Sequence, residues 1–472
     1  MRNYNTVEKK IAPKRKAQER ISDFNPIYRE LGDDEAIAQA SRCLQCPIDV
    51  LRGLNSEFSF CRTGCPLNNK IPLWLRNTYE GNNIGAFEAS NEMSPFPEIL
   101  GRVCPKVGLC ESSCVIEKSK FNAVSIGEVE VYLNEKAFDE GAKPDYGSKE
   151  GRKHKVAIIG SGPAGMSCAT FLLRSGLHVE IFEKADRVGG LLTYGIPNFK
   201  LPKNTVQRRF DWMQEAGLKV HTNVEVGKDI KVKELEEKFE RIFLAMGAPE
   251  GRSANMENEY ANGVYHVMEI LTKAQKKVFK QNFENSILRD KDVVVIGGGD
   301  SAMDALRTAI REGARSVQCV YRRDRQNMPG SQKEVDNAME EGVEFIFNRQ
   351  PKRVMVDKEM NVVGIEVLKT ELEISKDSKR GSLKVLEDVR MQIPADIIIL
   401  ALGFNNKIFD FYQELGIKLG KFNDILVNEK LQTSNPKIYA GGDVVRGADL
   451  VVTAALDGRI AAASIVESLK EV

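Results

Sequence analysis

The chain has 472 residues, enough for roughly three domains with cores of their own. Its 68 Lys and Arg residues against 67 Asp and Glu residues give a formal net charge of +1, which excludes binding to nucleic acid or an acidic membrane surface through overall charge. The N-terminus lacks the apolar core of a signal peptide and no apolar run approaches a membrane span, so we expect a cytoplasmic protein with no nucleic-acid and no membrane partner.

Residues 1–35 are polar and charged, with five basic side chains between Lys9 and Lys16. We expect them to form a solvent-exposed arm, with a specific docking patch as the alternative. From Asp34 onward, apolar residues recur at helical spacing. A small, mostly α-helical domain is therefore predicted for residues 1–150.

Seven of the nine cysteines lie in this first domain, between Cys43 and Cys114. Because the cytosol keeps thiols reduced, metal ligation is favoured over disulfides. Zinc would take four thiols per site and leave three over, whereas the Cys-x2-Cys and Cys-x3-Cys-Pro spacings are typical of iron–sulfur ligation. Seven thiols and one oxygen ligand would hold two 4Fe-4S clusters, with structural zinc as the alternative. Cys168 and Cys319 fall in a predicted helix and strand, where we expect core positions.

A polar, Gly-containing linker at 138–154 leads into the first nucleotide unit, predicted at 151–287. Apolar residues run into Gly160-Ser-Gly-Pro-Ala-Gly165, which predicts a strand, a tight turn and a helix start at the pyrophosphate of a dinucleotide. The next strand ends in Glu183, where a carboxylate binds ribose hydroxyls and repels a 2'-phosphate. This site therefore suits FAD or NAD.

Two further stretches belong to this first unit. The glycines and aromatic residues of 187–202 fit a loop along a flat ring system, with a plain loop as the alternative. Residues 241–248 predict a strand that meets the nucleotide loop.

A second strand-turn-helix signal begins the next unit, predicted at 288–404, with Gly297, Gly299 and Ala302 at the three glycine positions. Its following strand ends in Arg322 and Arg323 and not in an acid, which accommodates a 2'-phosphate and favours NADPH over NADH. The alternative is a solvated arginine pair.

The end of the chain continues both nucleotide units. Alternating residues over 353–389, on either side of a polar stretch at 375–381, predict a β-hairpin in the second unit. Residues 395–403 are a buried apolar run that we expect to return to the first unit, which 405–472 would complete. Residues 437–443, followed by a helix from Ala448, resemble the second FAD motif of flavoproteins with two dinucleotide sites. This resemblance places Asp443 near the ribityl or pyrophosphate group and the helix start at the flavin edge.

Several of these motifs resemble the small (β) subunit of NADPH-dependent glutamate synthase, over nearly the whole chain. They are 61–74, which begins Cys61-Arg-Thr-Gly-Cys65-Pro, then Gly101-Arg-Val-Cys104-Pro, 124–133, 189–191 with 195–201, and 328–331 with 334–343. Related electron-input modules occur in dihydropyrimidine dehydrogenase and in the large subunit of NADH-dependent ferredoxin:NADP oxidoreductase. The resemblance implies an α/β fold with two Rossmann-like dinucleotide-binding domains, adrenodoxin reductase-like, preceded by a small α-helical iron–sulfur domain. It also implies FAD, NADPH and two 4Fe-4S clusters as cofactors.

The resemblance implies two sets of cluster ligands. One set is Cys43, Cys46, Cys61 and Cys114, and the other is Cys65, Cys104, Cys110 and a non-cysteine ligand at the position of Glu130. Glu128 and solvent are alternatives to Glu130. Fourteen residues separate Cys46 from Cys61, more than the family has, which indicates an insertion within 48–60.

The residues expected to bind the nucleotides follow from the same motifs. For FAD they are Gly160, Gly162, Pro163, Ala164, Gly165, Glu183, Lys184, Gly190, Leu191, Gly442, Asp443, Val451 and Thr453. For NADP they are Gly297, Gly299, Asp300, Ser301, Ala302, Arg322 and Arg323.

The sequence offers no nucleophile with a partnered base, so the cofactors must carry the chemistry. By resemblance the chain is the electron-input subunit of glutamate synthase, which passes electrons from NADPH to a large (α) subunit that makes glutamate from glutamine and 2-oxoglutarate. The alternative is the large subunit of a ferredoxin:NADP transhydrogenase or sulfide dehydrogenase, paired with a ferredoxin reductase-like small subunit.

Overall fold

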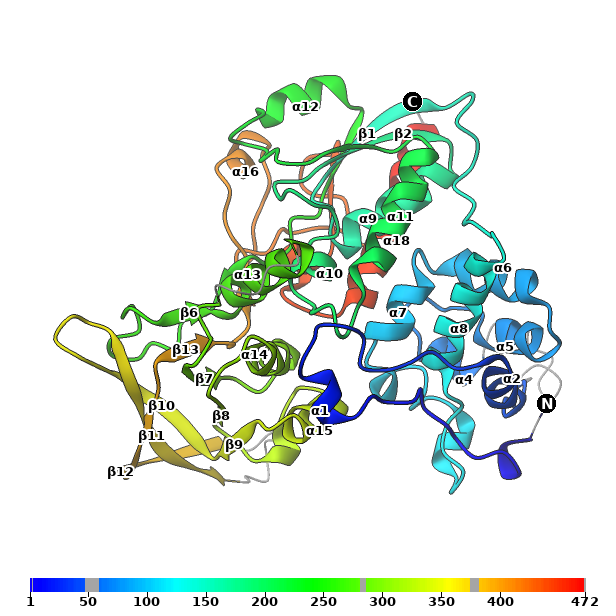
Figure 1. The fold of residues 1–472 in the computed structure, drawn as a ribbon. Coiled ribbons are helices and arrows are strands. Elements are labelled where there is room, and N and C mark those ends of the chain that lie inside the picture. Colours follow the sequence, from blue (N-terminus) through cyan, green and yellow to red (C-terminus); the bar gives the residue numbers. More distant parts are fainter. Residues whose placement is uncertain (2, 47–58, 281–285, 374–381, 471–472) are drawn as a thin grey trace.

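The computed structural model describes residues 1, 3–46, 59–280, 286–373 and 382–470. An α-helical N-terminal domain lies beside two units built on parallel sheets, and a three-stranded antiparallel sheet extends from the second of them (Figure 1). Within these residues no helix is long and apolar enough to cross a membrane. The predicted insertion at 48–60 lies almost wholly outside the described residues.

The N-terminal domain packs short helices around the fully buried indole of Trp74. Pro72 and Pro97 each stand in the first turn of a helix, where a missing N–H costs no hydrogen bond. The helices are α1 (Ala17–Arg20), α2 (Asp33–Ser41), α4 (Phe60–Thr63), α5 (Ile71–Tyr79), α6 (Asn83–Met93), α7 (Pro97–Val103) and α8 (Ile126–Asp139). This arrangement confirms the predicted α-helical character.

The N-terminal arm is only partly the solvent-exposed segment that was expected, because Arg20, Phe24, Ile27 and Leu31 are buried while most of its other residues are exposed or half-buried. It crosses to the second nucleotide unit, where α1 lies beside α15 (Gln332–Glu340) (Figure 1). The guanidinium of Arg20 is 1% exposed and donates to Glu341 at 2.7 Å and to Glu340 at 2.9 Å. The expectation failed because these carboxylates are remote in sequence, so no local pattern identifies them as partners.

The first nucleotide unit is a five-stranded parallel sheet in the order β15-β4-β1-β2-β3. Its strands are β1 (Lys153–Ile159), β2 (Leu177–Phe182), β3 (Lys219–His221), β4 (Arg241–Leu244) and β15 (Ile438–Ala440). Its helices are α9 (Pro163–Arg174), α10 (Leu191–Tyr194), α11 (Lys203–Glu215), α12 (Val232–Lys238), α16 (Phe411–Glu414), α17 (Asp443–Arg446) and α18 (Val451–Lys470). Since β15 pairs with β4, the C-terminal segment completes this sheet, as predicted.

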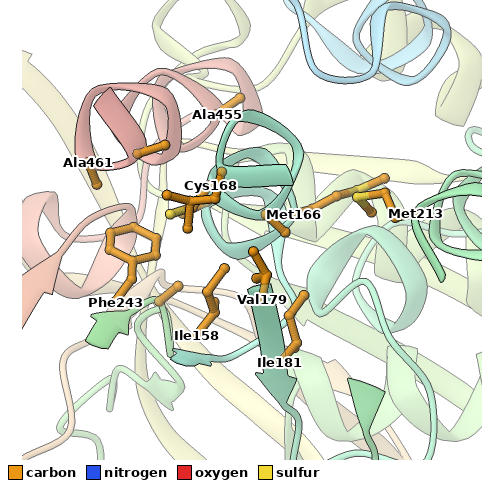
Figure 2. Packing of buried hydrophobic residues seen from close by; sticks show 14 of the residues in the cluster. Ile158, Met166, Cys168, Val179, Ile181, Met213, Phe243, Ala455 and Ala461 are labelled. Atoms are coloured by element: carbon orange, nitrogen blue, oxygen red, sulfur yellow. The ribbon is translucent and has the colours of Figure 1, made fainter. Parts of the chain in front are cut away.

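One face of this sheet is covered by α9 and α18 (Figure 2). Cys168 of α9 is fully buried among side chains of the sheet and of α18, which confirms its predicted core position. The two helices approach closely because α18 carries Gly458, where an added Cβ would lie 2.2 Å from the carbonyl oxygen of Ala164. This close packing brings the N-terminus of α18 to the nucleotide loop.

The second unit is another five-stranded parallel sheet, in the order β6-β13-β7-β8-β9. Its strands are β6 (Val264–His266), β7 (Asp292–Ile296), β8 (Ser316–Tyr321), β9 (Glu344–Phe347) and β13 (Ile397–Leu400), and its other helices are α13 (Val267–Lys280) and α14 (Asp300–Arg311). Cys319 on β8 is fully buried, as expected. The pairing of β6 with β13 shows that this unit begins upstream of the predicted boundary at 288.

The strand within 395–403 does not return to the first unit, so that expectation was wrong. Residues 397–400 pair with 293–296 of β7 and lie between β6 and β7 in the second sheet. A continuous apolar run is buried equally well in either parallel sheet, so its composition does not identify the sheet. The chain returns later, through β14 (Phe404–Asn405), which pairs with β5 (Glu250–Gly251).

The predicted hairpin is confirmed as the antiparallel pair of β11 (Val362–Glu373) and β12 (Ser382–Pro394). A third antiparallel strand, β10 (Arg349–Val356), pairs with the other edge of β11. The connection at 374–381 lies outside the described residues.

Candidate cofactor sites

A cavity of about 730 Å³ opens at the carboxyl ends of the first sheet's strands. Ligands bind at this edge of open α/β sheets. The predicted flavin residues that line it are Gly160, Gly162, Pro163, Ala164, Glu183, Lys184, Gly190, Leu191, Gly442, Asp443 and Val451. Gly165 and Thr453 do not line it. The structure thus brings most of the predicted set together around one space.

The glycines of the loop after β1 have separate roles. Gly160 has φ +99° and lies so close to the backbone of Ala245 that an added Cβ would be 2.5 Å from its oxygen. Gly165 packs α9 on the strand, since its Cβ would meet the oxygen of Gly160 at 2.1 Å. By contrast, a Cβ on Gly162 would meet nothing within 4 Å, on the cavity wall. The open backbone at Gly162, followed by the α9 N-terminus, fits a pyrophosphate.

Glu183 is almost buried at the end of β2. Its carboxylate accepts hydrogen bonds from the Ser161 backbone N–H at 3.0 Å, from the Ser161 hydroxyl at 2.6 Å and from the Ala185 N–H at 2.8 Å. The same residue that is predicted to bind ribose therefore also holds the glycine loop in shape.

Another part of the cavity wall comes from the C-terminal segment. Burial raises the pKa of Asp443 to about 6. The backbone N–H of Gly442 donates to Asp457 at 2.9 Å, which fixes this turn before α18. Thr453 instead donates to Asp449 and to the Leu450 carbonyl oxygen, within its own helix start.

The flavin-type loop at 187–202 divides between two environments. Its first half contributes Gly190, Leu191 and Tyr194 to the cavity. Phe199 and Lys200 do not line the cavity and contact α14 of the second unit instead. Lys203, directly after this loop, is buried and donates to the Leu192 carbonyl oxygen at 2.8 Å.

Sequence reasoning missed several cavity residues. The second unit contributes Met268, Thr272 and Lys276 from α13, and Phe404 from β14. The turn after β3 contributes residues 223–226. Only Asn223 had a local signal, because Asn tolerates the positive φ of 57° that it adopts there. The second unit's contribution depends on how the two units pack, which no local pattern reveals.

The predicted NADP loop follows β7. Gly297 has φ +143°, and its Cβ would lie 2.2 Å from the oxygen of Ala401, so only glycine fits. Ala302 is fully buried under the start of α14, and Asp300 accepts from the Ser331 N–H at 3.0 Å. Gly299 faces open space, as Gly162 does.

Arg322 and Arg323 lie directly after β8, next to this loop. Arg322 is exposed and Arg323 half-buried, and neither forms an ion pair with any residue that the structure describes. The guanidinium Nε of Arg323 is buried and has no hydrogen-bond partner among these residues. Such a pair is available to an anion.

The seven clustered thiols line two separate cavities. Cys65, Cys104, Cys110 and Glu130 line one, and Cys43, Cys46, Cys61 and Cys114 line the other. The pairing of residues is the one that the resemblance implied. Within the described part of the chain, no three His, Cys, Asp or Glu side chains converge on one metal ion. Two sets of four ligands, with Glu130 completing the set of three thiols, match the ligand count of two four-iron clusters.

The seven clustered thiols are buried or half-buried. Burial raises the pKa of Cys43 and Cys61 to about 12 and that of Cys104 and Cys110 well above its ordinary value. These side chains would remain neutral thiols at neutral pH, so metal binding must release their protons.

Glu130 lines its cavity, whereas Glu128 does not. The side-chain amide of Asn69 donates to Glu130 at 3.0 Å, and burial raises the pKa of this carboxyl group to about 8. Glu128 lies 3.6 Å from the ammonium of Lys106. Of the two, Glu130 has the position that a fourth ligand requires.

Comparison with known proteins agrees with this geometry. Residues 154–458 match a family model described as pyridine nucleotide-disulphide oxidoreductase, and residues 20–142 match one described as dihydropyrimidine dehydrogenase domain II, 4Fe-4S cluster. The chain is 40% identical to the NADPH glutamate synthase small chain of Escherichia coli, over 97% of this chain and 96% of that one. The chain belongs to the glutamate synthase small-chain family. It is therefore an NADPH-dependent flavin oxidoreductase with a 4Fe-4S domain.

Other known proteins are similar to this chain to the same degree. It is 41% identical to the glutamate synthase small chain of Azospirillum brasilense, over 97% of this chain and 94% of that one. It is also 41% identical to the putative oxidoreductase AegA of Escherichia coli, over 95% of this chain and 68% of that one. Among solved structures, Mycobacterium tuberculosis FprA in complex with NADPH has a TM-score of 0.57 at 18% identity, over 68% of this chain and 85% of that one. This likeness confirms the expected fold class.

Proposed function

We propose that this chain is the electron-input subunit of glutamate synthase. It oxidises NADPH at FAD and passes electrons through two 4Fe-4S clusters to a large (α) subunit that makes glutamate from glutamine and 2-oxoglutarate. The observation that carries this proposal is a wall shared by two cavities. Val451 lines the large cavity, and Val452 lines the cavity of Cys65, Cys104, Cys110 and Glu130.

The shared wall gives the sites an order. The cavity that Val452 lines is adjacent to the flavin site and would hold the first cluster, and the set with Cys43 would hold the second. Arg459 of α18 donates to the carbonyl oxygens of Leu67 at 2.9 Å and Met93 at 2.6 Å, which fixes this helix to the iron–sulfur domain. When bound, FAD takes a hydride from NADPH and releases electrons singly, and 4Fe-4S clusters carry one electron each.

The residues have distinct tasks in this proposal. Gly162 and the α9 N-terminus bind the FAD pyrophosphate, and Glu183 binds its ribose. Arg322 and Arg323 bind the 2'-phosphate of NADPH. A cytoplasmic location belongs to the proposal, because clustered free thiols persist in a reducing compartment.

A second candidate is the large subunit of a ferredoxin:NADP transhydrogenase or sulfide dehydrogenase, with a ferredoxin reductase-like small subunit. The similarity to AegA supports this second candidate, since that relative is named a putative oxidoreductase and not a glutamate synthase chain. It would use the same sites and differ in the acceptor.

The deciding experiment is anaerobic affinity purification of the chain from its native cell. We expect a large subunit with an N-terminal cysteine amidotransferase to co-elute, and the complex to make glutamate from glutamine, 2-oxoglutarate and NADPH. Co-elution of a small flavoprotein reductase in its place would replace the proposal with the second candidate.

A further inference from the structure

Three separate parts of the chain meet at one buried cluster of charges. Arg20 from the N-terminal arm and Arg307 and Arg311 from α14 all contact the carboxylate of Glu341, at 2.7, 2.8 and 2.7 Å. All four side chains are at most 1% exposed. We call these four residues the arginine junction. Buried charges persist only where each has a partner, so this geometry is tightly specified.

The first nucleotide unit joins this junction through Phe199. The ring of Phe199 lies under both guanidinium groups of α14, 4.6 Å from Arg307 and 4.1 Å from Arg311. Beside it, the ammonium of Lys200 donates to Asp304 of α14 at 2.7 Å. The loop that begins at the flavin cavity therefore ends against the second unit.

The arm lies across both units at this point. Its Ile27 N–H donates to the Phe199 carbonyl oxygen at 3.2 Å, and the Asn198 side chain donates to the Phe24 carbonyl oxygen at 2.9 Å. On the other side, Lys14 pairs with Glu340 at 2.6 Å. The arm thus connects the loop at 198–199 with the α15 end of the second unit.

The position of the second unit matters at the flavin cavity. Met268, Thr272 and Phe404 of that unit line the same cavity as the glycine loop. Hydride transfer needs donor and acceptor atoms about 3–3.5 Å apart, so a small displacement of one unit costs rate.

We propose that Arg20 is a positioning residue. Through Glu341 it fixes the NADP-binding unit against the flavin-binding unit, so that the nicotinamide meets the flavin without a domain rotation. This inference rests on the proposed FAD and NADPH sites and assigns a role in that reaction to the N-terminal arm.

Removing Arg20 leaves no charge without a partner. Glu341 keeps Arg307 and Arg311, and Glu340 keeps Lys14. Each unit therefore retains its own core, and the Phe199 and Lys200 contacts with α14 remain, so only the arm's buried tie to Glu341 is lost. For this reason Arg20→Met is expected to fold.

The test is anaerobic stopped-flow reduction of the bound flavin by saturating NADPH. In Arg20→Met we expect the limiting rate to fall about ten- to hundredfold. FAD content and the dissociation constant for NADP⁺ should stay at wild-type values. Arg20→Lys keeps the charge and should recover part of the rate. Phe199→Leu tests the same junction from the flavin unit and should slow the same step. The control is Arg29→Met, because Arg29 is exposed on the same arm.

The outcomes separate this inference from the proposed function. A wild-type limiting rate in both Arg20→Met and Phe199→Leu would overturn the positioning role. Loss of FAD, or an NADP⁺ dissociation constant that rises in parallel with the loss of rate, would also overturn it in favour of a purely structural role. If the flavin of the wild-type protein is not reduced by NADPH, the proposed function itself fails.

Discussion

Asn69 and Glu130 meet inside the cavity of Cys65, Cys104 and Cys110, where the side-chain amide donates to the carboxylate at 3.0 Å. This hydrogen bond orients one carboxylate oxygen and leaves the other oxygen free to coordinate a metal. Glu130 is therefore held in place before any cluster binds.

Glu130→Ala should change the EPR spectrum of one reduced cluster, because one iron loses its protein ligand. Flavin content should not change, since the cavity with Val451 is separate. The control is Glu128→Gln, because Glu128 lies on the same helix as Glu130 but pairs with Lys106. An EPR spectrum of Glu130→Ala identical to wild type would exclude Glu130 as a ligand.

Arg322→Ala combined with Arg323→Ala should raise the KM for NADPH by about 100-fold or more, because each charge-assisted contact to a phosphate contributes about 1.5–3 kcal/mol. The KM for NADH should change little, since NADH has no 2'-phosphate. Steady-state kinetics with both nucleotides measures the difference. Arg325→Ala is a matched control, because that guanidinium already pairs with Asp336. Equal changes for the two nucleotides would refute the assignment.

Gly162→Ala and Gly165→Ala should fail in different ways. A Cβ on Gly162 points into open cavity, so the protein should fold normally and lose FAD affinity. A Cβ on Gly165 would clash with the Gly160 carbonyl oxygen at 2.1 Å, which should lower the stability of the whole unit. Thermal unfolding and flavin absorbance after gel filtration distinguish the two. Normal FAD content in Gly162→Ala would argue against a pyrophosphate at that position.

Burial lowers the pKa of Lys203 from 10.5 to about 7, and this shift predicts a pH dependence of stability. Between these two values the unfolded chain binds more protons than the folded one, so stability rises with pH. Below pH 7 both states are protonated, and the folded protein bears the full cost of the buried charge, about 5 kcal/mol. Lys203→Met should therefore stabilise the protein most below pH 7, with an advantage that shrinks toward pH 10.

Unfolding temperatures of wild type and Lys203→Met across this range test the prediction. Lys228→Met is the control, because its side chain is 76% exposed and should show no pH-dependent difference. A constant advantage of Lys203→Met at all pH values would mean that Lys203 keeps its proton in the folded state.

The sequence predicted those features whose chemistry is local. Gly160 and Gly297 follow from the backbone that a tight nucleotide turn requires. The two sets of thiols followed from the family resemblance, and the structure groups them in the same way. For the two glycines a short segment contains the whole signal, whereas the grouping of the thiols required the comparison with a known family.

Features that depend on packing between distant segments were not predictable. Arg20 appeared to belong to a solvated arm because its partner, Glu341, is 321 residues away. The apolar run at 397–400 would fit inside either parallel sheet, and only its pairing with β7 shows that it belongs to the second one. Phe199 has the aromatic character of a flavin contact, but its ring packs against the guanidinium groups of Arg307 and Arg311 on α14.

Helix α18 gives the flavin cavity and the first thiol cavity a common structural element. Arg459 holds it to the iron–sulfur domain through two backbone oxygens, while Val451 touches the flavin side. The start of α18, and with it one wall of the flavin cavity, is therefore anchored on a folded iron–sulfur domain. A chain whose iron–sulfur domain fails to fold for want of iron is therefore expected to be purified short of FAD, whereas a variant that alters one cluster in a folded domain keeps its flavin.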